Sequence, residues 1–194
     1  MVDLKLYTIS DDYIAYLKSH VDKHVFANKD DSYVHSRKYL GAVLEINDYK
    51  YYIPLSSPKD SDYTEDSKGN KIVRKSIIPI IRMIDVDENG TKTLLGTLKL
   101  SNMIPASIEL LTLYDIDNEP DAKYKDLVEK EIRYINRHTA EIVRNASVLY
   151  KQKTNNEEIG YLRSTLDFKK LEEAHKQFSK ELTEEKAEWY ELTV

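Results

Sequence analysis

The first half of the chain alternates apolar and polar residues over short runs, the pattern of half-buried β-strands. Residues 4–9 (LKLYTI) predict a first strand, and Ser10 is placed to cap a short helix after it. Residues 39–46 and 49–55 predict a hairpin, because the intervening Asn47-Asp48 tolerate the positive φ of a two-residue turn.

A second hairpin follows a long charged loop. The loop covers residues 60–76 and is too long for a tight turn, while residues 76–86 and 91–100 flank the turn sequence DENG. Pro79 lacks a backbone N–H and cannot donate to a neighbouring strand. The first part of residues 76–86 is therefore predicted to lie at a sheet edge or in a bulge. Residues 102–116 add one more extended or mixed segment. Short strands and hairpins of this kind predict a small, strongly bent antiparallel β-barrel.

The periodicity changes after Pro120, where apolar residues recur at the 3.6-residue spacing of an amphipathic helix. Asp121 is placed to act as the N-cap, and the pattern continues to Leu149 as one long helix bent near residues 137–139 or as two helices. Residues 167–178 predict a further helix that begins with a capping aspartate. Because no Pro/Gly linker separates these helices from the sheet, we expect an α+β protein with packed helices and a mostly helical C-terminal half.

The charge distribution favours one domain followed by an acidic tail. The chain has 194 residues and a formal net charge of -5, which fits a single domain over residues 1–180. Residues 181–194 hold five acids and one base, and we interpret them as a solvated C-terminal tail. Residues 122–180 hold 13 Lys and Arg against nine Asp and Glu, so the overall charge does not exclude RNA as a partner.

Features that the sequence lacks argue against several classes of protein. The chain has no cysteine, no signal-peptide pattern and no apolar run long enough to span a membrane, so we expect a cytoplasmic protein with no membrane partner. No Gly-rich phosphate loop, nucleophile elbow or HExxH motif is present. His20 and His24 have chelating spacing but no third ligand, so we expect no metal and no cofactor. His35, close to Arg37, is the one histidine that we keep as a candidate.

The segment PLSSPK, residues 54–59, follows the second strand of the first hairpin. Its two prolines restrict the backbone, so Ser56 and Ser57 are expected at the rim of the sheet. Lys59 would reach the same space as a point charge for a phosphate. Considered without the rest of the chain, the serines are more typical of hydroxyls that satisfy a turn.

Tyrosine is unusually frequent, with 15 residues against three Phe and one Trp. Half-buried sheet faces explain most such tyrosines. The alternative is a surface that stacks RNA bases, for which Tyr7, Tyr33 and Tyr63 are candidates.

Several blocks of sequence, taken together, resemble one family. They are KLYTIS and YIAYL near the start, YLGAVLEINDYKYYIPLSSPK in the first hairpin, and NMIPA, PDAKYKDL and LDFKKLEE further on. In this order, from residue 5 to about residue 178, they resemble the ToxN/AbiQ family, the endoribonuclease toxins of type III toxin–antitoxin systems. The resemblance implies a compact barrel related to the Kid/MazF-like toxin fold and decorated by helices.

The resemblance also implies a reaction and a partner. The reaction is metal-independent cleavage of cellular and phage RNA by attack of the ribose 2'-hydroxyl, leaving a 2',3'-cyclic phosphate and a 5'-hydroxyl. The partner is an RNA antitoxin, a repeated pseudoknot that the toxin cuts from its precursor and that closes with it into an inhibited cyclic assembly. Such systems act in phage defence by abortive infection.

By the same resemblance, the family's functional positions can be transferred to this chain. A one-residue shift in the alignment would move the basic position from Arg37 to Lys38. Without the shift, the catalytic positions fall on Tyr13, Arg37, Ser56, Ser57 and Lys59.

The surface for the RNA antitoxin should be wider than the catalytic groove, and basic residues are its candidates. Each of those on the helices is alternatively an ordinary solvated side chain. The candidates are Lys38, Arg133, Arg137, Arg144, Lys151, Lys153 and Arg163. Two other functions remain open from the residues: a catalytically inactive RNA-binding module, and a protein-interaction domain that uses the tyrosine-rich sheet.

Overall fold

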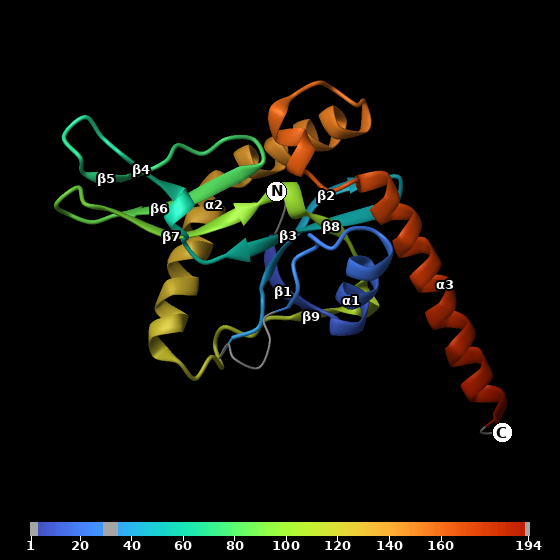
Figure 1. The fold of residues 1–194 in the computed structure, drawn as a ribbon. Helices are drawn as coiled ribbons and strands as arrows, with labels where there is room; N and C mark the ends of the chain where they lie inside the picture. The colour runs from blue at the N-terminus through green and yellow to red at the C-terminus, as the bar shows by residue number, and fades with distance from the viewer. Residues whose placement is uncertain (1–3, 29–34, 193–194) are drawn as a thin grey trace.

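An antiparallel sheet followed by two long helices makes up the described part of the chain, residues 4–28 and 35–192 of a computed structural model (Figure 1). The strands are β1 (Lys5–Ile9), β2 (Tyr39–Ile46), β3 (Tyr49–Ser56), β4 (Tyr63–Glu65), β5 (Lys71–Val73), β6 (Ile80–Val86), β7 (Lys92–Lys99), β8 (Ile104–Pro105) and β9 (Leu111–Leu113). The helices are α1 (Asp11–His20), α2 (Ala122–Thr154) and α3 (Phe168–Leu192). This element order confirms the predicted α+β class with a helical C-terminal half.

Strand β3 is the centre of the sheet and the place where the sheet divides. One edge of β3 pairs antiparallel with β2. The other edge pairs with β8 through Tyr51 and Tyr52, and with β7 through Leu55 and Ser56. The hydrogen-bonded path is therefore β6-β7-β3-β2-β1-β9, with the β6–β7 hairpin extending away as a separate arm (Figure 1).

The sheet is open, so the closed barrel expected from the sequence is not found. Within residues 4–28 and 35–192, no ladder joins β6 to β9, the two ends of the path. The physical reason is the attachment of β7, which pairs only with Leu55 and Ser56 at the end of β3 and so directs its hairpin outward. Strand β9, Leu111–Leu113, is also too short to offer a full edge for closure.

The first hairpin has the predicted turn. Asn47 and Asp48 adopt φ values of 51° and 69°, as a two-residue primed turn requires. The resulting register places Tyr39 opposite Pro54, and the N–H of Leu55 donates to the carbonyl oxygen of Lys38 at 2.9 Å. The residues that precede β2 therefore lie beside the residues that end β3.

The charged segment at residues 60–76 is more ordered than the sequence predicts. It contains the short β4–β5 hairpin, whose turn is held by the Asp66 carboxylate accepting from the backbone N–H groups of Lys68 and Asn70. After it, Ile80 begins β6 directly after Pro79, as the missing N–H of that proline predicted. A side-chain-capped turn of this kind has little signature in the hydrophobic pattern, which explains the missed hairpin.

Helix α2 is a single helix of 33 residues, which decides between the two predicted alternatives. The Asp121 carboxylate accepts from the N–H groups of Lys123 and Tyr124, so the predicted N-cap is confirmed. Its buried face includes Val128 and Ile142, and the helix packs against β2, β6 and β7. Helix α2 therefore covers the part of the sheet where β2, β6 and β7 lie.

Helix α3 begins after the predicted Asp167 cap but continues to Leu192, well beyond the predicted end at residue 178. Glu172 fixes this helix to the sheet and to α2. Its Oε1 accepts from the hydroxyls of Tyr51 at 2.8 Å and Tyr150 at 2.6 Å, and its Oε2 accepts from Lys169 at 2.8 Å. These contacts place a buried, fully used carboxylate where three elements meet.

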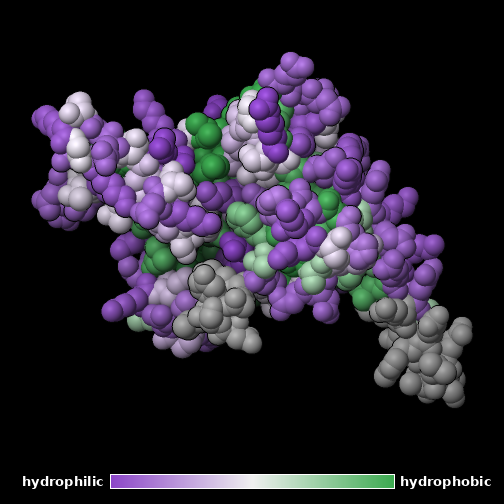
Figure 2. Space-filling model, viewed as in Figure 1, coloured by the Kyte–Doolittle hydropathy of each residue, from purple (hydrophilic) through white to green (hydrophobic). Residues whose placement is uncertain are grey.

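The surface is mostly hydrophilic on the face shown in Figure 2, including the arm that contains β4–β7 and the part of α3 that is drawn in colour. In the part of the chain that the structure describes, no helix combines the length and apolar character needed to cross a bilayer.

Candidate active site

A small cavity of about 110 Å³ lies between the end of β3, the segment before β2, and α2. The antiparallel register explains it, because pairing across Tyr39 and Pro54 brings the two strand ends together. The cavity is lined by Ser36, Arg37, Lys38, Leu55, Ser56, Ser57, Pro58, Leu95, Tyr124, Leu127 and Glu131. Four of the side chains predicted to act in the site, Arg37, Lys38, Ser56 and Ser57, thus meet here.

Arg37 is half-buried and held by backbone carbonyls on both sides. Its Nη1 donates to the carbonyl oxygen of Leu55 at 2.9 Å, and its Nε donates to that of Ala27 at 3.0 Å. The guanidinium also lies 4.8 Å above the centre of the Phe26 ring. These contacts orient a permanent positive charge directly beside Ser56.

Lys38 lies deeper than Arg37, with 7% of its surface exposed. Its Nζ donates to the carbonyl and hydroxyl oxygens of Ser36, both at 3.2 Å. The same ammonium lies 4.3 Å from the Tyr114 ring centre and 5.9 Å from that of Tyr124. Both candidates for the basic position therefore line the cavity, with Arg37 closer to the β3 end and Lys38 enclosed by aromatic rings.

The PLSSPK segment changes from buried to exposed along its length. Ser56 is half-buried at the end of β3, where its carbonyl oxygen accepts from the Thr97 hydroxyl at 3.4 Å, while Ser57 is exposed. Lys59 is exposed and does not line the cavity. Its backbone N–H donates to Asp62 Oδ2 at 3.0 Å, which fixes the loop directly after the serines.

Asp62 anchors this loop to a buried charge cluster that the sequence did not reveal. Its carboxylate is 1% exposed and lies 3.1 Å from Arg82 Nη2 and 3.8 Å from Lys99 Nζ. Burial lowers the pKa of Lys99, with Asp62 opposing and Arg82 and Lys59 adding to that effect. Arg82 and Lys99 therefore flank the buried carboxylate that holds the loop after Ser57.

The structure does not bring Tyr13 to this cavity. Tyr13 is 0% exposed, and its hydroxyl donates to the carbonyl oxygen of Pro105 at 2.7 Å. Burial, with weaker repulsion from Tyr16 and Tyr49, raises the pKa of Tyr13 well above its ordinary value. A side chain with no exposed surface cannot touch RNA in this conformation, so the observed role of Tyr13 is packing between α1 and β8.

Sequence reasoning missed the contribution of α2 to the cavity. Tyr124, Leu127 and Glu131 lie at i, i+3 and i+7, on one helical face. Burial raises the pKa of Tyr124 to about 12, with smaller contributions from Glu131 and Glu119. The signal that could have identified this site is Glu131, a carboxylate on an otherwise apolar helix face and only 8% exposed.

His35, the histidine kept as a candidate, stacks on Tyr124 with ring centres 3.7 Å apart. Its Nε2 is 3.4 Å from an Asp121 oxygen and its Nδ1 is 3.8 Å from a Glu119 oxygen. It therefore supports the N-terminus of α2 behind the cavity and does not line the cavity.

The predicted RNA-binding residues of α2 share a face. Arg133, Arg137, Arg144 and Lys151 are all exposed, and at 100° per residue they lie within about 40° of one another. The same geometry places this stripe about 180° from Tyr124, so it points away from the cavity. These four residues are separate from the candidate active site.

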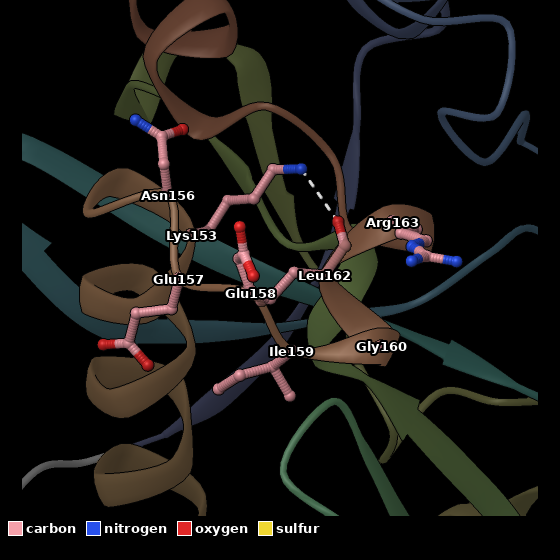
Figure 3. Close-up of a pocket in the computed structure, with 8 residues that line it drawn as sticks. All are labelled: Lys153, Asn156, Glu157, Glu158, Ile159, Gly160, Leu162 and Arg163. Atoms are coloured by element: carbon pink, nitrogen blue, oxygen red, sulfur yellow. Dashed lines mark hydrogen bonds between the residues drawn. The ribbon is translucent and has the colours of Figure 1, made fainter.

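The side chains of Lys153 and Arg163 lie in different surroundings (Figure 3). Lys153 donates to the carbonyl oxygen of Leu162 at 2.9 Å, so its ammonium ties the end of α2 to the following turn. Arg163 is exposed, and its guanidinium points away from Lys153 and Glu158 (Figure 3). Of the stacking candidates, Tyr7 and Tyr63 are half-buried, and Tyr33 lies outside the described residues.

In residues 4–28 and 35–192, no three His, Cys, Asp or Glu side chains are placed to hold a metal ion. The cavity instead combines cations, hydroxyls and one carboxylate. Such a set can bind a phosphodiester, stabilise added negative charge and transfer protons.

Comparison with known proteins gives relatives along nearly the whole chain. A protein from Pectobacterium atrosepticum named endoribonuclease ToxN is 34% identical over 179 residues, covering 92% of this chain and 95% of the relative. Endoribonuclease AbiQ of Lactococcus lactis subsp. lactis is 29% identical over 180 residues, covering 93% and 92% of the two chains.

Solved structures similar to this chain also cover nearly its whole length. One, from work on a processed non-coding RNA that regulates a bacterial antiviral system, has a TM-score of 0.73 at 30% identity and covers 89% of this chain and 97% of its own. Another, from work on selective toxin inhibition by a non-coding RNA pseudoknot, has a TM-score of 0.72 at 26% identity and covers 92% and 99%.

The family model for the toxin ToxN of type III toxin–antitoxin systems matches residues 5–176, which include every strand and the cavity at the end of β3. With that match added to the 34% identity over most of both chains, the chain belongs to the ToxN family of type III toxin–antitoxin systems.

Proposed function

We propose that this protein is an endoribonuclease toxin whose active site is the cavity at the end of β3. The observation that supports this best is the convergence of Arg37, Lys38, Ser56 and Ser57, which come from two separate segments and share one cavity. Relatives named endoribonucleases ToxN and AbiQ support the same activity. The substrates are cellular and phage RNA.

The cleavage chemistry that suits these groups is attack by the ribose 2'-hydroxyl on the adjacent phosphorus. The 2'-oxygen forms a bond to phosphorus, the bond to the 5'-oxygen breaks, and the products end in a 2',3'-cyclic phosphate and a 5'-hydroxyl. The protein must neutralise the charge of the phosphorane and transfer two protons. No metal ion is required for any of these steps.

Each residue then has a role that follows from its position. Arg37, held by the Leu55 carbonyl, stabilises the charge that develops on the non-bridging oxygens. Ser57 hydrogen-bonds a phosphate oxygen or orients the 2'-hydroxyl, with Ser56 beside it. Lys59 approaches from the exposed loop as a further cation, and Lys38 supports the base of the site.

A structured RNA inhibitor fits the same scheme. We propose that a repeated pseudoknot RNA is cut by this toxin and then occupies its cavity, in a cyclic assembly of toxin and RNA used in phage defence. The stripe Arg133, Arg137, Arg144 and Lys151 supplies a second basic surface for such an RNA. We also propose that residues 1–180 are one catalytic domain, that the acidic end of α3 lies outside it, and that the open sheet is related to the Kid/MazF-like toxin barrel.

The direct test is cleavage of an end-labelled RNA in the presence of EDTA by the wild type, Ser57→Ala and Ser61→Ala. Ser61 is the matched control, because it is exposed in the same loop and does not line the cavity. We expect cyclic-phosphate ends from the wild type and Ser61→Ala, and a rate about 10²- to 10³-fold lower for Ser57→Ala. Wild-type protein that binds RNA without cutting it would instead indicate an inactive RNA-binding module.

A further inference from the structure

A larger cavity, of about 580 Å³, lies beside the candidate active site and has no role in the chemistry above. One wall is the segment after α1, with Lys23, His24 and Phe26. The opposite wall is the turn that contains Arg163 and Ser164, and Asn102 lies between the two walls. Its volume is in the range of small-molecule sites.

Phe26 and Arg37 connect this cavity to the active site. The Arg37 guanidinium lies 4.8 Å above the ring of Phe26 and donates to the carbonyl oxygen of Leu55, the residue before Ser56. Arg37 lines the smaller cavity and Phe26 lines the larger one. An RNA strand whose phosphate lies at Arg37 therefore has its next nucleotide within reach of Phe26.

The lining suits a nucleotide in each of its parts. Phe26 offers an aromatic ring for a base, and Lys23 and Arg163 offer exposed cations for a phosphate. Ser164 and Asn102 add neutral hydrogen-bonding groups. The acidic residue in this lining, Asp22, is engaged with His24. One of its carboxylate oxygens accepts from the backbone N–H of His24 at 2.8 Å and lies 2.7 Å from the His24 ring nitrogen.

Hydrogen bonds to backbone carbonyl oxygens hold the two walls in place. Asn102 Nδ2 donates to the carbonyl oxygen of His24 at 3.1 Å, and the N–H of Leu166 donates to that of Ser101 at 3.0 Å. The carbonyl of Phe26 accepts from the hydroxyl of the buried Tyr39 at 3.4 Å. The cavity is therefore preformed, which limits the ordering cost of binding.

We propose that this cavity binds one nucleotide of single-stranded RNA next to the scissile phosphate, with the base against Phe26 and the phosphate at Arg163 and Lys23. The inference rests on the proposed function and adds the subsite that positions the substrate. Phe26 and Arg163 are positioning residues in this arrangement, since neither touches the reacting atoms.

The test is a series of RNA oligonucleotides around one mapped cleavage position, shortened by one nucleotide at a time from either end. We expect kcat/KM of the wild type to fall about tenfold or more when the nucleotide that occupies the cavity is removed, the size of one base–aromatic stacking interaction. In Phe26→Leu and in Arg163→Gln, removal of the same nucleotide should lower kcat/KM by less than threefold. Lys176→Gln, an exposed basic residue on α3, should retain the full step.

Two outcomes would overturn the subsite while leaving the nuclease activity established: no such step in the wild type, or an undiminished step in both variants. The same oligonucleotides with deoxyribose at the scissile nucleotide cannot be cut, and their dissociation constants should show the same pattern. A wild type that cuts none of the ribose series would count against the proposed function itself, and the deoxyribose series would still show whether the cavity binds a nucleotide.

Discussion

Arg37 donates a 2.9 Å hydrogen bond from Nη1 to the carbonyl oxygen of Leu55, so the cation before β2 is attached to the residue that precedes Ser56. A second hydrogen bond, from Nε to Ala27, fixes the plane of the guanidinium. Lys38 makes neither contact and instead directs its ammonium toward Ser36 and two tyrosine rings. These geometries favour Arg37 as the residue that meets the phosphate.

We therefore expect Arg37→Gln to lower the cleavage rate by about 10²- to 10³-fold, the usual cost of removing a charge-stabilising donor. Arg37→Lys should not restore the rate, because an ammonium cannot make both carbonyl contacts of the planar fork. Initial rates on labelled RNA measure the cleavage rate of each variant. Thermal melts check that the variants are folded, and Lys92→Gln on β7 is the control. A normal rate in Arg37→Gln with loss in Lys38→Gln would assign the basic position to Lys38.

Tyr13→Phe should affect stability and leave catalysis nearly unchanged. The substitution removes only the buried hydroxyl that donates to Pro105, and it leaves a carbonyl without that donor. We expect the free energy of unfolding to fall by about 1–2 kcal/mol, with a cleavage rate within threefold of the wild type at a temperature where both are folded. Urea unfolding and cleavage assays on the same preparation separate the two effects. A folded variant with a large loss of rate would return Tyr13 to the catalytic group.

Gly96→Ala should impair cleavage by crowding the floor of the cavity. A methyl group at Gly96 would lie 2.5 Å from Glu131 Oε1 and 3.1 Å from the carbonyl oxygen of Ser56. Both groups must move, so we expect a lower cleavage rate and a stability cost of about 1–3 kcal/mol. Gly160→Ala is the matched control, since nothing lies within 4 Å of its added methyl. Equal behaviour of the two variants would show that the Glu131 and Ser56 positions are not critical.

His175 should make stability depend on pH. Its ring contacts Tyr13 and Tyr49 edge-on, and its Nδ1 has no hydrogen-bond partner among the residues that the structure describes. Burial lowers the pKa of His175 below its ordinary value, with a weaker opposing effect from Glu109. Between that lowered pKa and about 6.5, the unfolded chain binds a proton that the folded protein excludes. The free energy of unfolding should therefore fall as pH falls below about 6.5, by at most ~1.4 kcal/mol per unit.

Urea midpoints at pH 7.5, 6.5 and 5.5 would measure this dependence. His175→Phe keeps an aromatic ring at the same place, so the loss below pH 6.5 should be smaller in this variant than in the wild type. The exposed His20, changed to Gln, serves as the control and should leave the slope as it is in the wild type. An unchanged slope in His175→Phe would show that other groups cause it.

Local patterns in the sequence determined several elements of this protein, although they missed the β4–β5 hairpin. Asn47-Asp48 specify a primed turn, and Asp121 and Asp167 specify helix starts, because turns and caps depend only on residues within a few positions. The resemblance carried by the LSSPK segment predicted Ser56 and Ser57 as site residues, and both line the cavity at the end of β3. The predictions of a barrel and of a helix ending at residue 178 were wrong. Barrel closure and helix length depend on contacts between residues far apart in the sequence.

Only the tertiary structure decided which side chains share the site. The 3.6-residue period shows that one face of α2 is buried, but it does not say that Tyr124 and Glu131 meet the end of β3. The position of Tyr13 in the first turn after the capping Ser10 does not show whether its side chain is exposed or buried. In the structure, packing of α3 against α1 buries it. Hydrogen bonds between near neighbours are encoded locally, whereas burial and the meeting of distant residues arise from the packing of the whole chain.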